Sequence, residues 1–319
     1  MNIEGKVFVA GHTGLVGSAI VRALKRSGFT RLALASIEDI DLRDPVSVRS
    51  YYERERPDYV IIAAAKVGGI HANRTYPAEF IYDNLMIQNN LIHNAYLNQV
   101  KKLLFLGSSC IYPRECPQPM KEEYIMTGPL EPTNESYALA KLAGIRMAKA
   151  YSEQYKVNYI SVLPCNLYGP GDSFDLQNSH VLSALVRRFS DAISDGKGEV
   201  VLWGTGIARR EFMWVDDMAE ACVVLMQKYD SPEIINVGTG TDVTIRELAE
   251  LIAVKTGFTG KLVWDANMPD GMLRKCLDIS RMREYGVEHR ISLEEGVVRM
   301  IAEYQARKPT LRRYDQIQP

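Results

Sequence analysis

The chain has 319 residues, of which 46% are hydrophobic and 24% are charged, and its formal net charge is −1. The length suffices for two domains, the composition is that of a globular protein, and no apolar run approaches the roughly 20 residues of a membrane helix. The near-zero charge gives no bulk attraction to nucleic acid or to a membrane surface, so we expect neither as a partner.

A glycine-rich turn follows the first predicted strand. Residues 6–10 are apolar and β-branched, and a helical stretch to residue 27 follows the turn, whose glycines are spaced GxxGxxG. Glycines let the backbone approach a pyrophosphate, and amide groups at a helix start meet its charge. We therefore predict a dinucleotide-binding turn, against the alternative of a plain strand–helix turn. Its candidate cofactor residues are Gly11, His12, Thr13, Gly14, Leu15, Val16 and Gly17.

The second predicted strand, residues 31–36, leads into the loop that usually distinguishes NAD from NADP. Residues 36–42 contain no arginine where the 2′-phosphate of NADP would lie. Asp41 and Leu42 can frame the adenine, although an aspartate at such a place is more often a helix cap. A helix is predicted over residues 46–56.

Further strands and helices alternate through the first half. Strands are predicted over residues 59–62, 102–106 and 158–163, and a long helix over residues 77–98. This alternation predicts an α/β fold, a doubly wound parallel Rossmann sheet. The fourth strand ends in Leu106, Gly107, Ser108 and Ser109, at the carboxyl edge where such sheets place their chemistry.

Tyr137 and Lys141 lie four residues apart on a helix predicted over residues 134–155, so they share one face. A phenol has a pKa near ~10, which a neighbouring cation lowers. Such a tyrosine can protonate an alkoxide or deprotonate an alcohol. The alternative is a surface helix that carries an unrelated Tyr and Lys.

The second half has shorter elements. We predict strands at 200–203 and 261–264, helices at 181–194, 215–227, 244–255 and 293–306, and a return of residues 235–238 to the main sheet. Asp216 and Asp217 open a helix, so we assign them to capping rather than to catalysis. We expect a Rossmann domain of residues 1–166, with a return segment near 211–240, and a smaller, partly interleaved lobe of residues 167–319. The polar tail from Arg307 is expected to be poorly ordered.

Ser108, Tyr137 and Lys141, together with the N-terminal GxxGxxG, resemble an extended short-chain dehydrogenase/reductase. Six further blocks resemble the GDP-L-fucose synthase family, which comprises GDP-4-keto-6-deoxymannose 3,5-epimerase/4-reductases. The resemblance runs from residue 7 to about residue 304, and its blocks are residues 66–70, 106–113, 130–135, 166–170, 178–181 and 210–212.

The resemblance implies a bifunctional reaction. A ketone at C4 of a hexose acidifies C3 and C5, and inversion needs a base and an acid, here Cys110 and His180. Their ordinary pKa values, near ~8.5 and ~6.5, lie close to neutrality. In the reduction, Tyr137 would protonate the alkoxide, Ser108 would hold its oxygen, and Lys141 would lower the tyrosine pKa and hold the nicotinamide ribose. Without the family blocks, a packing role for Cys110 and a capping role for His180 would be the ordinary readings.

The same resemblance implies NADP(H) as cofactor and a GDP-sugar as substrate. Further cofactor contacts are implied for Pro164, Cys165, Asn166, Leu167 and His180, and substrate contacts for Arg188, Trp203, Arg210 and Asp270. Thr13 and Ile37 stand where many family members carry arginines for the 2′-phosphate, so discrimination against NADH is expected to be weak. Some relatives act on GDP-linked keto-heptoses, and some of these only reduce, so the sugar stays open. A reductase or 4-epimerase of another nucleotide sugar and a catalytically silent NADP-binding regulator are further alternatives. A homodimer that pairs through the helices of residues 77–98 and 134–155 is also implied.

Five cysteines show no zinc-like spacing, and their odd number argues against a disulfide framework. The polar first six residues do not resemble a secretory signal. We therefore expect a reduced, cytoplasmic protein with no metal centre.

Overall fold

A six-stranded, wholly parallel sheet forms the centre of the computed structural model, which describes residues 1–176, 179–268 and 270–315. Its strand order is β10-β5-β4-β3-β1-β2. The predicted doubly wound sheet is confirmed, and the predicted return of residues 235–238 is confirmed by β10. The strands are β1 (Val7–Ala10), β2 (Leu32–Ala33), β3 (Tyr59–Ile62), β4 (Lys102–Leu106), β5 (Asn158–Pro164) and β10 (Ile234–Val237).

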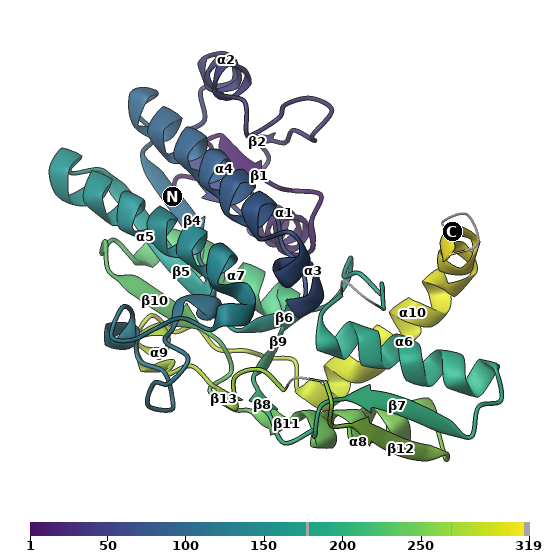
Figure 1. The fold of residues 1–319 in the computed structure, drawn as a ribbon. Coiled ribbons are helices and arrows are strands. Elements are labelled where there is room, and N and C mark those ends of the chain that lie inside the picture. The colour runs from purple at the N-terminus through teal and green to yellow at the C-terminus, as the bar shows by residue number, and fades with distance from the viewer. Residues whose placement is uncertain (177–178, 269, 316–319) are drawn as a thin grey trace.

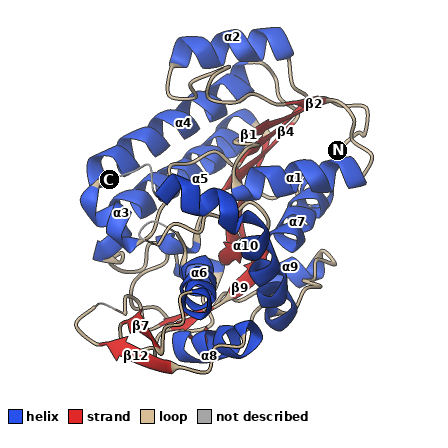
Figure 2. Cartoon of the chain, turned by 90° about the vertical axis from the view of Figure 1, so that its right-hand side faces the viewer, coloured by secondary structure: helices blue, strands red, loops and turns tan. Residues whose placement is uncertain are grey.

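Helices cover both faces of this sheet (Figures 1 and 2). On one face lie α2 (Pro45–Glu55), α4 (Pro77–Leu97) and α5 (Glu135–Tyr155), and on the other α1 (Leu15–Arg26) and α7 (Val215–Lys228). Successive side chains of a strand point to opposite faces, so Val7 and Val9 pack with α1 and α7 while Phe8 packs with α2 and α4. Strands covered on both faces are apolar throughout, which is why their bounds can be predicted from sequence.

A smaller lobe lies below the sheet domain in the view of Figure 1. Its helices α6 (Val181–Ser194), α8 (Ile245–Thr256) and α10 (Leu293–Asp315) pack against the parallel pair β7 (Glu199–Trp203) and β12 (Lys261–Asp265). Phe189, Leu248 and Met300 belong to its separate hydrophobic core. The division into residues 1–166 and 167–319 remains a prediction.

Several short elements connect the two parts. A three-stranded sheet has the order β11-β8-β13, and β6 pairs with β9 in parallel. Segments of two to six residues carry too little periodicity to be predicted. They are β6 (Asn166–Tyr168), β8 (Arg209–Arg210), β9 (Phe212–Trp214), β11 (Val243–Thr244), β13 (Arg274–Lys275), α3 (Ile70–Thr75), α9 (Ser280–Glu284) and the 3₁₀ turns η1 (Ser109–Ile111), η2 (Glu122–Tyr124) and η3 (Pro132–Asn134).

Two predictions were wrong in extent. The second strand comprises only Leu32–Ala33, and α10 continues to Asp315 instead of ending at residue 306. The expected poor order of the tail stays a prediction. The Arg307 guanidinium donates to the Asp172 carbonyl and pairs with Glu303 one turn earlier, which holds the added turns to the lobe. None of the described helices is both long and apolar enough to cross a membrane.

Candidate active site

The glycine turn between β1 and α1 is sterically constrained. Gly11 has a φ of +84°, and a Cβ there would lie 2.6 Å from the Ala64 amide nitrogen. A Cβ on Gly17 would lie 2.0 Å from the Gly11 carbonyl oxygen. Gly14 caps α1, whose first turn carries no acidic residue, so the positive end of the helix dipole is available to an anion. His12, Thr13, Leu15 and Val16 complete this turn.

The loop after β2 is rich in carboxylates that are already hydrogen-bonded. Asp39 accepts from the amide and hydroxyl of Ser36 at 2.9 and 3.1 Å. Arg43 donates to both oxygens of Asp41, at 3.0 and 2.9 Å, and to Asp83 at 3.4 Å. Arg43 is the one basic residue among positions 34–44. The loop therefore offers a cofactor more negative than positive charge.

Ser108, Tyr137 and Lys141 come together at the carboxyl end of β4. Ser108 caps η1, and its hydroxyl accepts from the Cys110 amide at 3.2 Å and is also hydrogen-bonded to Tyr137. Lys141 is only 3% exposed, donates to the Leu106 carbonyl at 2.8 Å, and lies 6.0 Å from the centre of the Tyr137 ring. A substrate oxygen placed beside Ser108 and Tyr137 would meet two hydroxyl donors.

The sequence-based expectation that Lys141 lowers the tyrosine pKa is wrong for this arrangement. Burial raises the pKa of Tyr137, and the neighbouring Cys110 adds to the effect against the opposing hydrogen bond from Ser108. Burial also lowers the pKa of Lys141 to about 7, and its ammonium bonds to a carbonyl rather than to the phenol. Desolvation disfavours both charged forms here. Tyr137 consequently keeps its proton at neutral pH, as a proton donor must.

The buried ammonium predicts a pH-dependent stability cost. Lys141 has a folded pKa of about 7 against an ordinary 10.5, so the unfolded chain binds more protons between these values and stability rises with pH there. Replacing Lys141 with Met should raise the unfolding free energy by roughly 2–4 kcal/mol at pH 6, with the gain vanishing toward pH 10. Paired denaturant unfolding curves at the two pH values measure this. A variant that is less stable at both would contradict it.

Cys110 and His180 carry opposite electrostatic biases. The Lys275 ammonium lies 3.4 Å from the Cys110 sulfur. Burial of that thiol opposes ionisation, but Lys275, Ser108 and His180 outweigh it and lower the pKa of Cys110 below its ordinary value. His180 caps α6 with Nδ1 3.9 Å from Asp172, and this carboxylate raises the His180 pKa. The pair is thus biased toward thiolate and imidazolium, a base and an acid.

The predicted substrate residues form two neighbouring pairs. The Arg188 guanidinium carbon lies 5.3 Å from the centre of the half-exposed Trp203 ring. Arg210 donates to the Asp270 carbonyl at 3.2 Å. The Asp270 carboxylate accepts from the amide and hydroxyl of Thr205 at 2.8 and 2.7 Å, in the turn that follows Trp203. The four predicted residues therefore surround one turn of the smaller lobe.

Pro164 ends β5, the neighbour of β4, and Cys165, Asn166 and Leu167 come directly after it, so all four lie at the same sheet edge. Burial raises the Cys165 thiol pKa well above its ordinary value, which favours an unreactive thiol. Asn178, part of one family block, lies outside the described residues. Among the described residues no three His, Cys, Asp or Glu side chains are grouped to hold a metal ion.

Sequence reasoning missed the roles of Asp172 and Lys275. Arg274 donates to Asp242 at 2.5 Å, and its neighbour Lys275 contacts Cys110. No local pattern links Lys275 to a cysteine 165 positions earlier. Asp216 and Asp217 lie in the first turn of α7 but neither caps it by a side-chain hydrogen bond. Asp217 accepts from the amides of Arg290 and Ile291 at 2.9 Å each, and Asp216 pairs with Arg22, so both have structural roles.

The matched family is described as the NAD dependent epimerase/dehydratase family, and the match covers residues 7–238. The chain belongs to this family, whose fold it shares. It is 56% identical over 294 residues to GDP-L-fucose synthase 1 of Arabidopsis thaliana, which covers 92% of this chain and 91% of that protein.

Two solved structures share the whole architecture. A GDP-L-fucose synthetase from Naegleria fowleri bound to NADP has a TM-score of 0.89 at 27% identity and covers 97% of each chain. A GDP-6-OMe-4-keto-L-xylo-heptose reductase from C. jejuni has a TM-score of 0.90 at 35% identity, covering 97% of this chain and 99% of that one.

Proposed function

We propose that the chain is a bifunctional GDP-4-keto-6-deoxymannose 3,5-epimerase and NADPH-dependent 4-reductase that makes GDP-L-fucose. The observation that carries the proposal is that one sheet edge holds both a hydroxyl pair suited to ketone reduction and an acid–base pair suited to epimerisation. Ser108 and Tyr137 offer hydroxyls to one oxygen, while Cys110 and His180 are biased as base and acid beside them. The similarity to the Arabidopsis thaliana GDP-L-fucose synthase 1 supports the same assignment.

In the epimerisation, the Cys110 thiolate would remove a proton from a carbon next to the ketone, and His180 would return one to the opposite face. The enolate oxygen formed between these steps needs hydrogen-bond donors, and Ser108 and Tyr137 supply them. Asp172 raises the pKa of His180, which favours its role as acid, and Lys275 lowers the pKa of Cys110, which favours its role as base.

In the reduction, bound NADPH supplies a hydride to C4. Tyr137 protonates the alkoxide that results, and its raised pKa keeps the required proton in place at neutral pH. Because enolate and alkoxide share one oxygen, Ser108 and Tyr137 serve both reactions without moving the sugar. Lys141, which donates to the Leu106 carbonyl, would hold the nicotinamide ribose.

The glycine turn is compatible with a dinucleotide because the first turn of α1 carries no acidic residue and its amide groups can meet a pyrophosphate. Gly11 and Gly17 permit the tight turn, since a Cβ at either would collide with neighbouring backbone. The loop after β2 fits the 2′-phosphate of NADP less well, because its one guanidinium is held by Asp41 and Asp83. We infer that NADPH is used but that NADH is only weakly excluded.

Replacing Ile37 with Arg tests this inference, because Ile37 is 69% exposed in that loop. The added cation should tighten NADPH binding about tenfold and leave NADH binding nearly unchanged. Fluorescence titration of both cofactors at low and high salt measures it. Val254→Arg, on exposed α8, adds the same charge in the other lobe and should change neither affinity. An equal gain for both cofactors would place Ile37 away from the 2′-phosphate.

The smaller lobe would hold the GDP-sugar. Arg188 and Arg210 supply guanidinium forks for its phosphates, and Trp203 supplies an aromatic face for a ring. Burial disfavours the charge on both arginines and lowers their pKa, so a bound diphosphate would compensate that cost.

A second candidate is the reduction of a GDP-linked 4-keto-heptose, favoured by the likeness to the C. jejuni heptose reductase. The two candidates differ in the sugar and not in the use of Tyr137. Incubating the enzyme with NADPH and either GDP-4-keto-6-deoxymannose or a GDP-4-keto-heptose, with NMR of the products, separates them. GDP-L-fucose from the first substrate supports our proposal. Turnover of the heptose alone would replace it.

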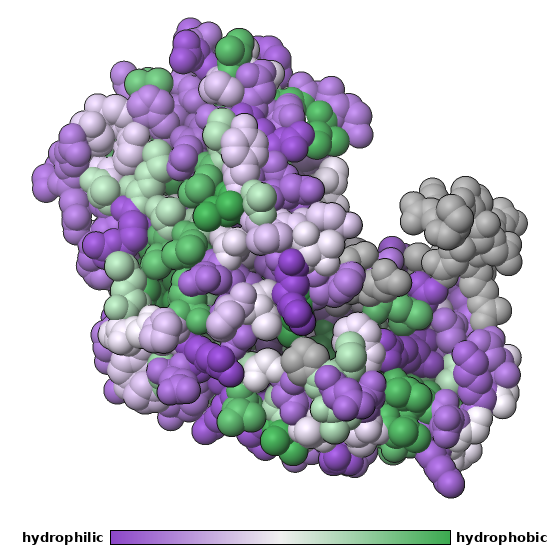
Figure 3. All heavy atoms as spheres, in the orientation of Figure 1, coloured by the Kyte–Doolittle hydropathy of each residue, from purple (hydrophilic) through white to green (hydrophobic). Residues whose placement is uncertain are grey.

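We also infer a homodimer that pairs through α4 and α5. Hydrophobic side chains gather over these two helices (Figure 3). Tyr82 and Leu97 on α4 and Leu139 and Tyr155 on α5 are between 41% and 60% exposed. Exposed apolar side chains gathered on one face are typical of an interface.

Leu139→Glu should convert the dimer to a monomer in sedimentation velocity, because the new charge would be buried without a partner. Val254→Glu, a matched change on the 73% exposed Val254 of α8, should leave the dimer intact. A wild-type monomer at micromolar concentration would refute the dimer.

A further inference from the structure

Lys275 reaches the Cys110 thiol from a strand of two residues, β13, that lies between the two parts of the molecule. One edge of this strand pairs with β8, where Arg274 is opposite Arg209 and Lys275 is opposite Arg210. A strand so short has little stability of its own. What holds its other edge therefore decides where the Lys275 ammonium lies.

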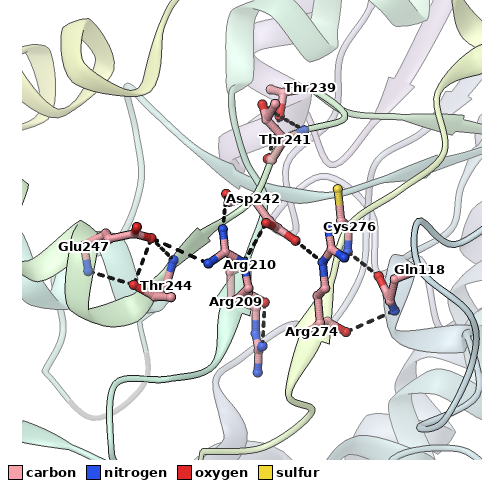
Figure 4. Close-up of polar contacts among 10 residues, drawn as sticks. All are labelled: Gln118, Arg209, Arg210, Thr239, Thr241, Asp242, Thr244, Glu247, Arg274 and Cys276. Atoms are coloured by element: carbon pink, nitrogen blue, oxygen red, sulfur yellow. Dashed lines mark hydrogen bonds and ion pairs between the residues drawn. The ribbon is translucent and has the colours of Figure 1, made fainter.

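The side chain of Gln118 occupies that other edge (Figure 4). Its Nε2 donates to the Arg274 carbonyl at 3.1 Å, and its Oε1 accepts from the Cys276 amide at 3.0 Å. One carboxamide thus bonds the residue before Lys275 and the residue after it, as the backbone of a neighbouring strand would. Replacing the carboxamide with an apolar group would remove both hydrogen bonds.

The segment of Gln118 also carries the thiol. Cys110 and Gln118 both lie in the connection from β4 to α5. This connection continues alongside the same partner: the Met120 amide donates to the Cys276 carbonyl at 2.7 Å, and the Asp278 amide donates to the Met120 carbonyl at 2.9 Å. The carboxamide therefore ties the segment of the thiol to the segment of the ammonium.

We propose that Gln118 is a positioning residue that fixes Lys275 against Cys110 and thereby sets the acidity of the catalytic thiol. The effect of Gln118 on epimerisation rests on the function proposed above. The effect of Gln118 on the acidity of the Cys110 thiol does not depend on that function.

Lys275 is not the only group that faces the sulfur. His180 at the start of α6, Arg210 on β8, Tyr137 on α5 and Ser108 in its own turn also interact with it. Among these, Lys275 has the largest favourable effect on the thiolate and is the one held through Gln118. An ammonium at 3.4 Å loses much of this effect when it moves away by an ångström or two into solvent.

The test is the pH dependence of Cys110 alkylation by iodoacetamide in the sugar-free enzyme, followed by mass spectrometry of the peptide that contains Cys110. Reading that peptide separates its label from that of Cys116. Lys275→Met is the reference that removes the cation. Gln118→Leu removes both hydrogen bonds, and Gln118→Asn withdraws the carboxamide by one methylene. Gln227→Leu, at an exposed position of α7, is the matched control.

We expect Lys275→Met to move the alkylation midpoint upward by about one pH unit, and Gln118→Leu and Gln118→Asn to move it in the same direction by at least half as much. Gln227→Leu should leave it in place. At pH 7 the Gln118 variants should epimerise several-fold more slowly, and they should recover toward pH 9 while their reduction of a pre-epimerised ketone is unchanged.

A midpoint that moves with Lys275→Met but stays fixed in folded Gln118→Asn would overturn the proposal. So would a midpoint that does not respond to Lys275→Met. Circular dichroism identifies which Gln118 variants are folded. If Gln118→Leu does not fold, Gln118→Asn provides the test, because it keeps a carboxamide at this position. If the alkylation midpoints shift as expected but the wild-type enzyme does not epimerise the sugar, the proposed function is refuted and the positioning role of Gln118 stands.

Discussion

Tyr137→Phe is expected to slow ketone reduction by about 10²- to 10⁴-fold, because it removes the proton that the alkoxide must receive. Burial raises the pKa of this phenol, so the hydroxyl is protonated throughout the neutral range and its loss cannot be compensated by a change of pH. The measurement is single-turnover oxidation of NADPH with an excess of the keto-sugar. Binding of the cofactor should be unchanged, since the ring is retained.

The matched control is Tyr76→Phe, which removes a hydroxyl from a half-exposed tyrosine just before α4. It should leave the rate within twofold of the wild type. Near-normal turnover of Tyr137→Phe would reject this phenol as the proton donor and would turn attention to Ser108 or water.

Cys110→Ser should slow proton exchange at C3 and C5 by about 10²-fold or more, while some direct reduction of the unepimerised ketone remains. A serine hydroxyl in the same place has a far higher pKa than the thiol, so Lys275 cannot make it a base near neutrality. Deuterium uptake and NADPH oxidation are measured on the same preparation.

Cys116→Ser is the control, because Cys116 is another partly exposed thiol and burial raises its pKa. Both activities should persist in it. If exchange and reduction fall together in Cys110→Ser, the division of labour between Cys110 and Tyr137 is wrong.

The main sheet could be predicted because its strands are buried on both faces. Residues 59–62 and 102–106 were predicted with the observed bounds, as was α6. The pairing of Tyr137 with Lys141 could be predicted as well, since a helix fixes residues four apart on one face. The electrostatic outcome could not, because it depends on how completely the fold excludes water from both groups.

The contacts between the two parts of the molecule were not accessible from sequence. β8 and β13 have two residues each, which is too short for a periodic signal. Lys275 meets Cys110 across 165 positions, and Gln118 meets Arg274 across 156. Such pairs follow from the path of the whole chain, and no local spacing rule indicates them.

The measurement that tests the central claim most directly is NMR of GDP-4-keto-6-deoxymannose incubated with the enzyme in deuterated water and without NADPH. A thiolate and an imidazolium beside the C3 and C5 positions should introduce deuterium at both carbons before any hydride is transferred. Retention of protium at both, with a folded enzyme that still reduces the ketone when NADPH is added, would contradict the epimerase and leave a simple reductase.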